Sequence, residues 1–420
     1  MQRWRFPRFV SPIAALMMLF ALTACMRGPI VAAPAGPPQP SGPAPGTPLL
    51  NTPPPGAAGP VKVAVLLPLS GANAELGKAM LEAAQLALFT TGSDRLTLVP
   101  RDTSGAPDGA AGAARAALAD GAQLIIGPLL AAEVDAVKPV AAEAKVNVIA
   151  FSTATQLAGD NVFLMGFLPR QEVVREVAFA RERGASRFAV LAPNSEYGRL
   201  MTDALRESAG QAGATVVKAD SFDPRSGDVA PAIQRLAGKS ASTAPEAPPD
   251  AAPSPAPPAG TNFDALLLPE GGDQLKQIAR RLKTAGIGAP QVHLLGSGLW
   301  DDPSISSEPA LVGGWFAASP PDARREFQSR FQATYGHPPP RLASLAFDAA
   351  ALAAALAKAG GSAPFSHDAI LNPSGFTGVD GLFRFTPNGL VQRGLAVLEV
   401  QPQGPVVVSP APRDFRDFVY

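Results

Sequence analysis

Short apolar runs alternate with longer amphipathic segments through most of the chain. Residues 61–67 form an apolar, β-branched run of the kind found in the middle of a parallel sheet. Residues 75–90 then carry apolar side chains at helical spacing. The same alternation predicts further strands at 96–101, 124–128 and 146–150, and helices at 110–119 and 131–144. This order of elements predicts an α/β fold with a parallel sheet that is covered by helices on both faces.

The alternation then starts again. It predicts helices at 173–183, 198–212, 229–237 and 274–285, and strands at 187–192, 215–219, 263–268 and 291–295. Two successive α/β units of similar size predict two lobes. Because ligands of parallel sheets bind beyond the carboxyl ends of the strands, the binding site is expected in the cleft between the lobes.

The N-terminal segment indicates export and attachment to a membrane. Arg3, Arg5 and Arg8 precede an apolar run over 9–24, which is too short to span a bilayer and is typical of a secretory signal. The run ends at Cys25, the one cysteine of the chain, and 22–25 resemble a bacterial lipobox. This resemblance implies a signal peptide at 1–24 and a lipid-bearing Cys25. In such lipoproteins an aspartate directly after the cysteine often retains the protein at the inner membrane. Met26 occupies that position here, so the resemblance favours attachment to the periplasmic face of the outer membrane.

Two segments are rich in proline. Residues 25–60 are predicted to form a disordered tether, because they cannot bury enough apolar surface to order themselves. Residues 239–261 interrupt the α/β pattern and are predicted to be a disordered insertion in the second lobe.

Charge and motifs argue against several classes of function. The 35 basic and 35 acidic residues leave no positive surplus for binding nucleic acid. His293, His337 and His367 do not have the spacing of metal ligands, and each is expected to be structural. No nucleophile elbow, Walker loop or dinucleotide-binding motif is present. We therefore expect a non-enzymatic protein without a cofactor or metal.

Several short segments together resemble the type I periplasmic-binding proteins of the leucine-binding group. They are 65–71, 125–128, 149–155, 194–198, 335–338 and 378–389, and the resemblance spans roughly 61–401. It implies three chain crossings between the lobes, near 166–169, 296–300 and 377–381. Lobe 1 would then comprise 61–168 with 299–379, lobe 2 would comprise 169–298 with 380–405, and 406–420 would be a C-terminal tail.

In this family hydroxyls and backbone N–H groups hold the carboxylate of an amino acid, and an acidic side chain holds its ammonium. By resemblance, the candidate cleft residues are Ser70, Ser152, Thr153, Thr155, Tyr197 and Glu270. The alternatives are turn capping for 152–155, simple packing for Tyr197 and a solvated loop position for Glu270.

The sequence also departs from the family pattern. Residues 128–132 offer no hydroxyl, and Arg170 stands where an acid is common. The resemblance therefore implies, first, a lipoprotein that activates a penicillin-binding protein, the peptidoglycan synthase. The alternative is the substrate-binding protein of an ABC transporter, which would present a captured amino acid or a related small ligand to a permease. A ligand sensor is a third hypothesis.

Overall fold

The computed structural model describes residues 60–238 and 261–416. The predicted signal peptide, Cys25, almost all of the predicted tether and nearly all of the predicted insertion lie outside these residues. Among the described residues, no helix combines the length and the apolar character needed to cross a membrane.

The first sheet is parallel, with the strand order β2-β1-β3-β4-β5. Its strands are β1 (Val61–Leu67), β2 (Leu96–Asp102), β3 (Ala122–Ile126), β4 (Asn147–Ala150) and β5 (Val162–Leu164). Residues 63–67 of β1 have no exposed surface, because helices cover both faces of this sheet.

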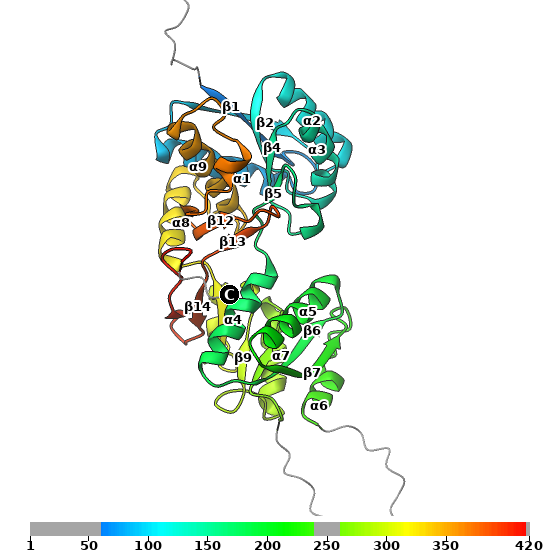
Figure 1. Ribbon diagram of the computed structural model, residues 1–420. Helices are drawn as coiled ribbons and strands as arrows, with labels where there is room; N and C mark the ends of the chain where they lie inside the picture. Colours follow the sequence, from blue (N-terminus) through cyan, green and yellow to red (C-terminus); the bar gives the residue numbers. More distant parts are fainter. Residues whose placement is uncertain (1–59, 239–260, 417–420) are drawn as a thin grey trace, which may run out of the picture. The chain divides into compact units, whose positions relative to one another are not determined.

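One face of this sheet is covered by an apolar core that contains helices α1 (Ala74–Thr91) and α9 (Ala343–Ala359). The other face is covered by a second core that contains α2 (Pro107–Ala119) and α3 (Ala131–Glu143) (Figure 1). The first core also receives α8 (Pro321–Tyr335), α10 (His367–Ile370) and a small antiparallel sheet of β11 (Phe376–Gly378), β12 (Gly381–Phe385) and β13 (Val391–Arg393). These elements together form lobe 1.

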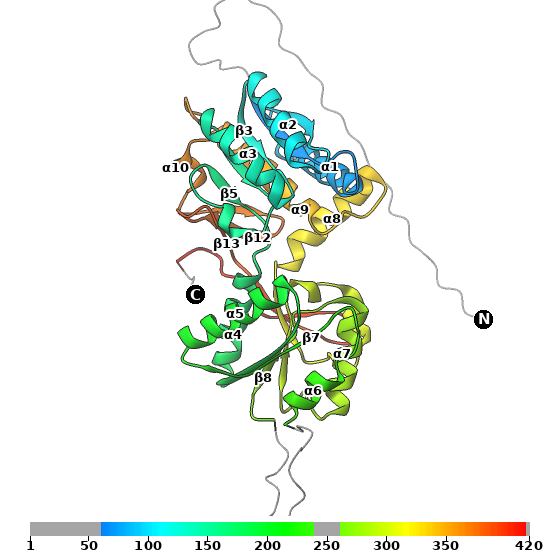
Figure 2. The same cartoon turned by 90° about the vertical axis from the view of Figure 1, so that its right-hand side faces the viewer.

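Lobe 2 is built on a seven-stranded sheet with the order β15-β14-β10-β9-β8-β6-β7. Its strands are β6 (Arg187–Pro193), β7 (Thr215–Phe222), β8 (Ala265–Leu267), β9 (His293–Leu295), β10 (Trp315–Ala318), β14 (Ala396–Glu399) and β15 (Val406–Ser409). Helices α4 (Pro169–Glu182) and α5 (Glu196–Gln211) cover one face, and α6 (Ala230–Leu236) and α7 (Gly272–Thr284) cover the other (Figure 2). The predicted α/β fold with two helix-flanked sheets is therefore confirmed. The lobe 1 sheet is parallel throughout, and the lobe 2 sheet is parallel from β7 to β10 and ends with the antiparallel strands β14 and β15.

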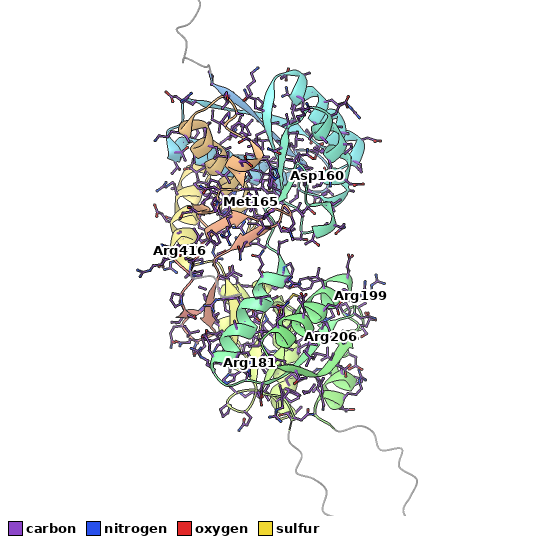
Figure 3. The ribbon with its side chains drawn as sticks, in the orientation of Figure 1. Asp160, Met165, Arg181, Arg199, Arg206 and Arg416 are labelled. Carbon is purple, nitrogen blue, oxygen red and sulfur yellow. The ribbon has the colours of Figure 1, made fainter. Side chains whose placement is uncertain are left out.

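The described chain passes between the lobes at three places, but only the first lies where the sequence predicted it. The first follows Met165 and enters α4 at Pro169 (Figure 3). The second lies at 319–320 and not at 296–300, because β10 pairs with β9 and β14 inside the lobe 2 sheet. The third lies at 394–395 and not at 377–381, because the β12–β13 hairpin buries its apolar side chains in the core of lobe 1.

The predicted lobe boundaries therefore change. Residues 299–318 belong to lobe 2 and 380–393 belong to lobe 1. The predicted C-terminal tail is also wrong at its start, since β15 pairs with β14 in antiparallel fashion and adds a strand to lobe 2. Beyond it, the Arg384 guanidinium lies 4.3 Å from the centre of the Phe415 ring, so part of the terminal segment packs against lobe 1.

Helix α5 approaches the end of β6 so closely that only glycine fits at its third position. A Cβ atom at Gly198 would lie 1.9 Å from the carbonyl oxygen of Pro193, whereas one at Gly210 of the same helix would meet nothing within 4 Å. Gly198→Ala is therefore expected to lower the free energy of unfolding by about 1–3 kcal/mol.

Gly210→Ala is the matched control for this prediction. It should raise the free energy of unfolding by about 0.5–1 kcal/mol, because alanine loses less conformational freedom in a helix than glycine does. Urea denaturation of both variants measures the difference, and equal effects of the two substitutions would contradict the close approach of α5 to β6.

Candidate functional site

A cavity of about 670 Å³ is lined by residues of both lobes. Lobe 1 contributes Thr153 and Thr155, which follow β4, and the segment from Thr386 to Arg393 around the turn between β12 and β13. Lobe 2 contributes the first turns of α4 and one side of α5. This volume falls within the range of sites that enclose small organic ligands. The structure thus brings Thr153 and Thr155 to a cavity between the lobes.

Charged side chains of α4 and α5 line the lobe 2 side of this cavity. The Arg170 guanidinium binds both carboxylate oxygens of Glu207, with 2.7 Å between Nη2 and Oε1. Arg199, which Figure 3 places on α5, lies near the first turn of its helix between Glu196 and Asp203, and all three line the cavity. This wall therefore carries two arginines and three acids. Arg170, which stands where the family often has an acid, is engaged with Glu207.

Both predicted serines, and also Tyr197 and Glu270, lie outside the cavity lining. The Ser152 hydroxyl accepts the N–H of Ala154 at 3.1 Å, which is the turn-capping alternative. The N–H of Ser70 donates to Asp102 Oδ1 at 3.2 Å. Both serines thus stabilise turns at the ends of lobe 1 strands.

Tyr197 and Glu270 lie together beyond the carboxyl ends of the lobe 2 strands. Tyr197 lies in the first turn of α5 after β6, and Glu270 follows β8. Burial, and then the charge of Glu172, raises the pKa of the Tyr197 hydroxyl well above its usual range. The structure therefore places Tyr197 and Glu270 at the lobe 2 strand ends, next to a further acid.

That acid is Glu172 of α4. Its Oε2 accepts the N–H of Gly298 at 2.8 Å, and part of the residue remains accessible to solvent. Burial of the carboxyl raises its pKa to about 7, even though the Gly298 N–H and the charge of Arg341 lower it. The run from Pro169 to Glu172 drew attention to Arg170, but the helix directs Arg170 outward and Glu172 inward. The signal in the sequence was the spacing of Glu172 and Glu176, which puts them one turn apart on the same side of α4.

Backbone N–H groups at the strand ends of lobe 1 are occupied by carboxylates of the protein itself. Asp102 Oδ1 accepts the N–H groups of Leu69 at 2.8 Å, Ser70 at 3.2 Å and Ser104 at 2.8 Å. At the start of α3, the fully buried Glu133 accepts the N–H of Leu130 at 3.1 Å through Oε2. Its Oε1 is buried and has no hydrogen-bond partner. These donors are therefore not available to an anionic ligand.

A network of ion pairs surrounds the three connections between the lobes. Arg341 Nη1 lies 3.0 Å from Asp380 Oδ1, its guanidinium lies 3.9 Å from the centre of the Phe167 ring, and its Nη2 donates to Ser319 Oγ at 3.3 Å. Phe167 lies in the first connection and Ser319 in the second. Arg341 of lobe 1 thus contacts two of the connections directly.

The same network reaches the third connection and lobe 2. Arg393, which precedes the third connection, is almost fully buried and donates through Nη2 to the carbonyl of Met165 at 2.8 Å. Asp301 of lobe 2 binds Arg324 of α8, with 2.7 Å between Oδ1 and Nη2. The network therefore links the lobes where the chain passes between them.

The histidines have structural surroundings. His293 stacks on Trp315 with 4.0 Å between the ring centres, His337 lies 3.2 Å from a Glu82 oxygen, and the ring of His367 lies beside Phe163. Within residues 60–238 and 261–416, no group of three or more histidine, cysteine, aspartate or glutamate side chains is placed to hold a metal ion.

A sequence profile of the periplasmic binding proteins matches residues 60–405. The chain belongs to the periplasmic binding protein family. No curated protein sequence matches it significantly.

Solved structures share the fold of this periplasmic binding protein. A putative branched-chain amino acid ABC transporter protein from Rhodospirillum rubrum is 20% identical, with a TM-score of 0.70 over 83% of this chain and 100% of that one. A leucine-binding protein from Thermotoga maritima is 20% identical, with a TM-score of 0.57 over 85% of this chain and 100% of that one. A solute-binding protein from Rhodopseudomonas palustris in complex with benzoate is 19% identical, with a TM-score of 0.56 over 85% and 98%.

Proposed function

We propose that this periplasmic binding protein captures a small organic solute between its lobes for an ABC transporter. The observation that carries the proposal is the cavity of about 670 Å³, which hydroxyls after β4 and the first turns of α4 and α5 line from opposite lobes. The carboxyl ends of parallel strands are where α/β proteins bind ligands. The similar solved proteins are named as transporter components for branched-chain amino acids or as solute-binding proteins.

Transport is proposed here in place of activation of a penicillin-binding protein. The activator hypothesis drew on the hydroxyl-free turn at 128–132, on Arg170 and on Met26. Arg170 is engaged by Glu207, and Glu172, two residues further on, is an acid on the inward side of the same helix. The difference from the family pattern at Arg170 is therefore smaller than the sequence suggested. Attachment of the protein to the outer membrane through a lipid on Cys25 stays part of the proposal.

Isothermal titration with leucine, isoleucine, benzoate and the amines and amides of the same skeletons tests the transport proposal. We expect saturable one-to-one binding of at least one of these solutes. A solute at one hundred times its dissociation constant should also raise the free energy of unfolding by about 2.7 kcal/mol.

Replacing Thr153 and Thr155 together with valine should weaken binding about tenfold, because two hydroxyl hydrogen bonds of roughly 0.5–1.5 kcal/mol each would be lost. Thr215→Val, at the exposed start of β7, is the matched control and should leave affinity unchanged. A panel in which no solute binds, or an affinity that is insensitive to the paired substitution, would count against a solute site at this cavity.

A further inference from the structure

One charged side chain of the cavity lining is buried. Of the arginines that line the cavity, Arg170 and Arg199 are exposed, whereas Arg393 has only 2% of its surface exposed. Arg393 ends β13, directly before the third connection between the lobes. A guanidinium stays charged in proteins, and burying a charge is costly unless hydrogen bonds replace those that it made with water. The hydrogen bonds of Arg393 therefore matter for what the cavity can bind.

Most of the Arg393 guanidinium is not engaged by the protein. Its Nη2 donates to the carbonyl oxygen of Met165 at 2.8 Å, but Nε and Nη1 are buried and have no hydrogen-bond partner. Arg175 of α4, which is also almost fully buried, instead donates through Nε to the carbonyl oxygen of Leu395 at 3.0 Å and through Nη2 to Ser409 Oγ at 2.6 Å. Buried donors normally have acceptors, so the two nitrogens of Arg393 indicate an acceptor that comes from outside the chain.

Arg393 also lacks a carboxylate of its own. Asp380 pairs with Arg341 at 3.0 Å, and across the described residues no carboxylate oxygen lies within 4.0 Å of the Arg393 guanidinium. The charges of Asp380 and Asp348 act on Arg393 from a greater distance. Burial raises the pKa of the Asp348 carboxyl to about 7, so this group is only partly ionised at neutral pH. The positive charge of Arg393 is therefore incompletely balanced by the protein.

Other donors for an anion are occupied at the strand ends of lobe 1. Asp102 accepts the N–H groups at the end of β1, and Glu133 accepts the N–H of Leu130 at the start of α3. Thr153 and Thr155, by contrast, are exposed and line the same cavity as Arg393. Lobe 1 thus offers the cavity two hydroxyls and one buried guanidinium.

Apolar side chains of both lobes complete the lining. Leu200 of α5, with 38% of its surface exposed, is one of them. The others are Leu168, Val174, Ala204, Leu390 and Val391. This surface suits an apolar group, because covering it removes apolar area from water.

From these observations we propose that Arg393 determines which solutes are captured, by binding a carboxylate that is attached to an apolar body. The carboxylate lies at Arg393, with Thr153 and Thr155 as further donors, and the apolar body lies along α4 and α5. Hydrogen bonds between an ionised donor and an ionised acceptor are stronger than neutral ones, which favours a carboxylate over an amide of the same shape. The proposal rests on the proposed capture of a solute and names the residue that sets its class.

The test compares each carboxylate with its own amide on the purified, unmodified protein, by isothermal titration at pH 7.5. The pairs are benzoate with benzamide, 4-methylpentanoate with 4-methylpentanamide, and leucine with leucinamide. In every pair that binds, we expect the carboxylate to bind about tenfold more tightly or better, the effect of a hydrogen bond to a charged group. Amides that bind as tightly as their carboxylates overturn this proposal and leave the capture of a solute standing. Binding of none of the six, together with a failed wider panel, overturns both.

A variant connects the preference to Arg393. Arg393→Gln removes the charge and should reduce the preference for benzoate over benzamide from about tenfold to less than about threefold. The ratio is the useful measurement, because a cavity that was merely distorted would bind both solutes less tightly. Arg175→Gln is the matched control, since Arg175 is buried near the same connection but does not line the cavity, and it should keep the preference. A folded Arg393→Gln protein that keeps the full preference overturns the assignment to Arg393.

A conservative variant covers the case in which Arg393→Gln does not fold. Arg393→Lys keeps the positive charge at this position, so it should keep more of the preference for benzoate over benzamide than Arg393→Gln does. A folded Arg393→Lys protein that prefers benzamide would overturn the proposal. The comparison of carboxylates with amides needs no variant, so it tests the proposal even if neither substitution yields a folded protein.

Discussion

Replacing Asp380 with alanine is expected to lower the free energy of unfolding by about 3–5 kcal/mol, the cost of removing one partner from a buried group of ion pairs. Asp380 is fully buried, accepts the Ser344 hydroxyl at 2.6 Å, and lies 3.0 Å from Arg341 Nη1. Burial acts to raise the pKa of Asp380, but the charges of Arg341 and Arg393 outweigh it and hold the pKa below its usual range. The carboxylate is therefore ionised at neutral pH. Replacing Asp380 with alanine removes this negative charge from the surroundings of the buried Arg393 guanidinium.

The sign of the pH dependence follows from the lowered pKa. The stability that Asp380 contributes is present at neutral pH and is lost as the pH falls through the acidic range. Asp380→Ala should therefore differ most from the unmodified protein at neutral pH and less in acid. Guanidinium denaturation at several pH values measures this difference.

The exposed pair of Asp322 and Arg325 on α8 supplies the control. Asp322→Ala should change stability little, because solvent screens exposed ion pairs. Similar effects of Asp380→Ala and Asp322→Ala would show that the network at the connections does not stabilise the fold.

The second large effect is expected for Trp300→Ala, which should lower the free energy of unfolding by about 3–5 kcal/mol. Trp300 is fully buried, and its ring fills the space beside Gly296 and Gly314, where a Cβ atom would lie 2.1 Å and 2.8 Å from ring atoms. Its Nε1–H donates to the carbonyl of Leu268 at 3.2 Å. Trp300 thus holds together the segments that follow β8 and β9 and precede β10, where Glu270 and Ser297 are found.

Trp300→Phe separates packing from hydrogen bonding. It keeps most of the buried ring, so it should cost about 1–2 kcal/mol, because the indole hydrogen bond to the Leu268 carbonyl is lost while that carbonyl still accepts the N–H of Glu270. Thermal unfolding of the two variants, followed by circular dichroism, gives the comparison. If Trp300→Ala lowers the free energy of unfolding no more than Trp300→Phe does, the cavity left by the ring collapses without cost.

Local pattern was sufficient to predict most strands and helices of both lobes. The apolar run at 61–67 became β1 without change, because a strand buried on both faces needs a continuous run of apolar side chains. The segment 376–393 was correctly associated with the family but was divided between the lobes at the wrong place. An antiparallel hairpin can pack on either lobe, and its sequence alone does not reveal which core it joins.

The candidate site was predicted in part. Thr153 and Thr155 line the cavity, and Tyr197 and Glu270 lie together at the lobe 2 strand ends, as the positions after β4, β6 and β8 suggested. Ser70 and Ser152 instead stabilise turns. Glu172 was overlooked because its importance depends on Gly298, which is 126 residues further along the chain.

The sequence by itself determined the two-lobed α/β architecture, because hydrophobic periodicity and the order of elements are local properties that restrict the possible topologies. Only the tertiary structure decided where the chain passes between the lobes, and which carboxylates are paired with an arginine. These features depend on contacts between residues far apart in sequence, such as Arg341 with Phe167 and Glu172 with Gly298. Charge pairing between residues so far apart is set by the whole fold, and no local pattern encodes it.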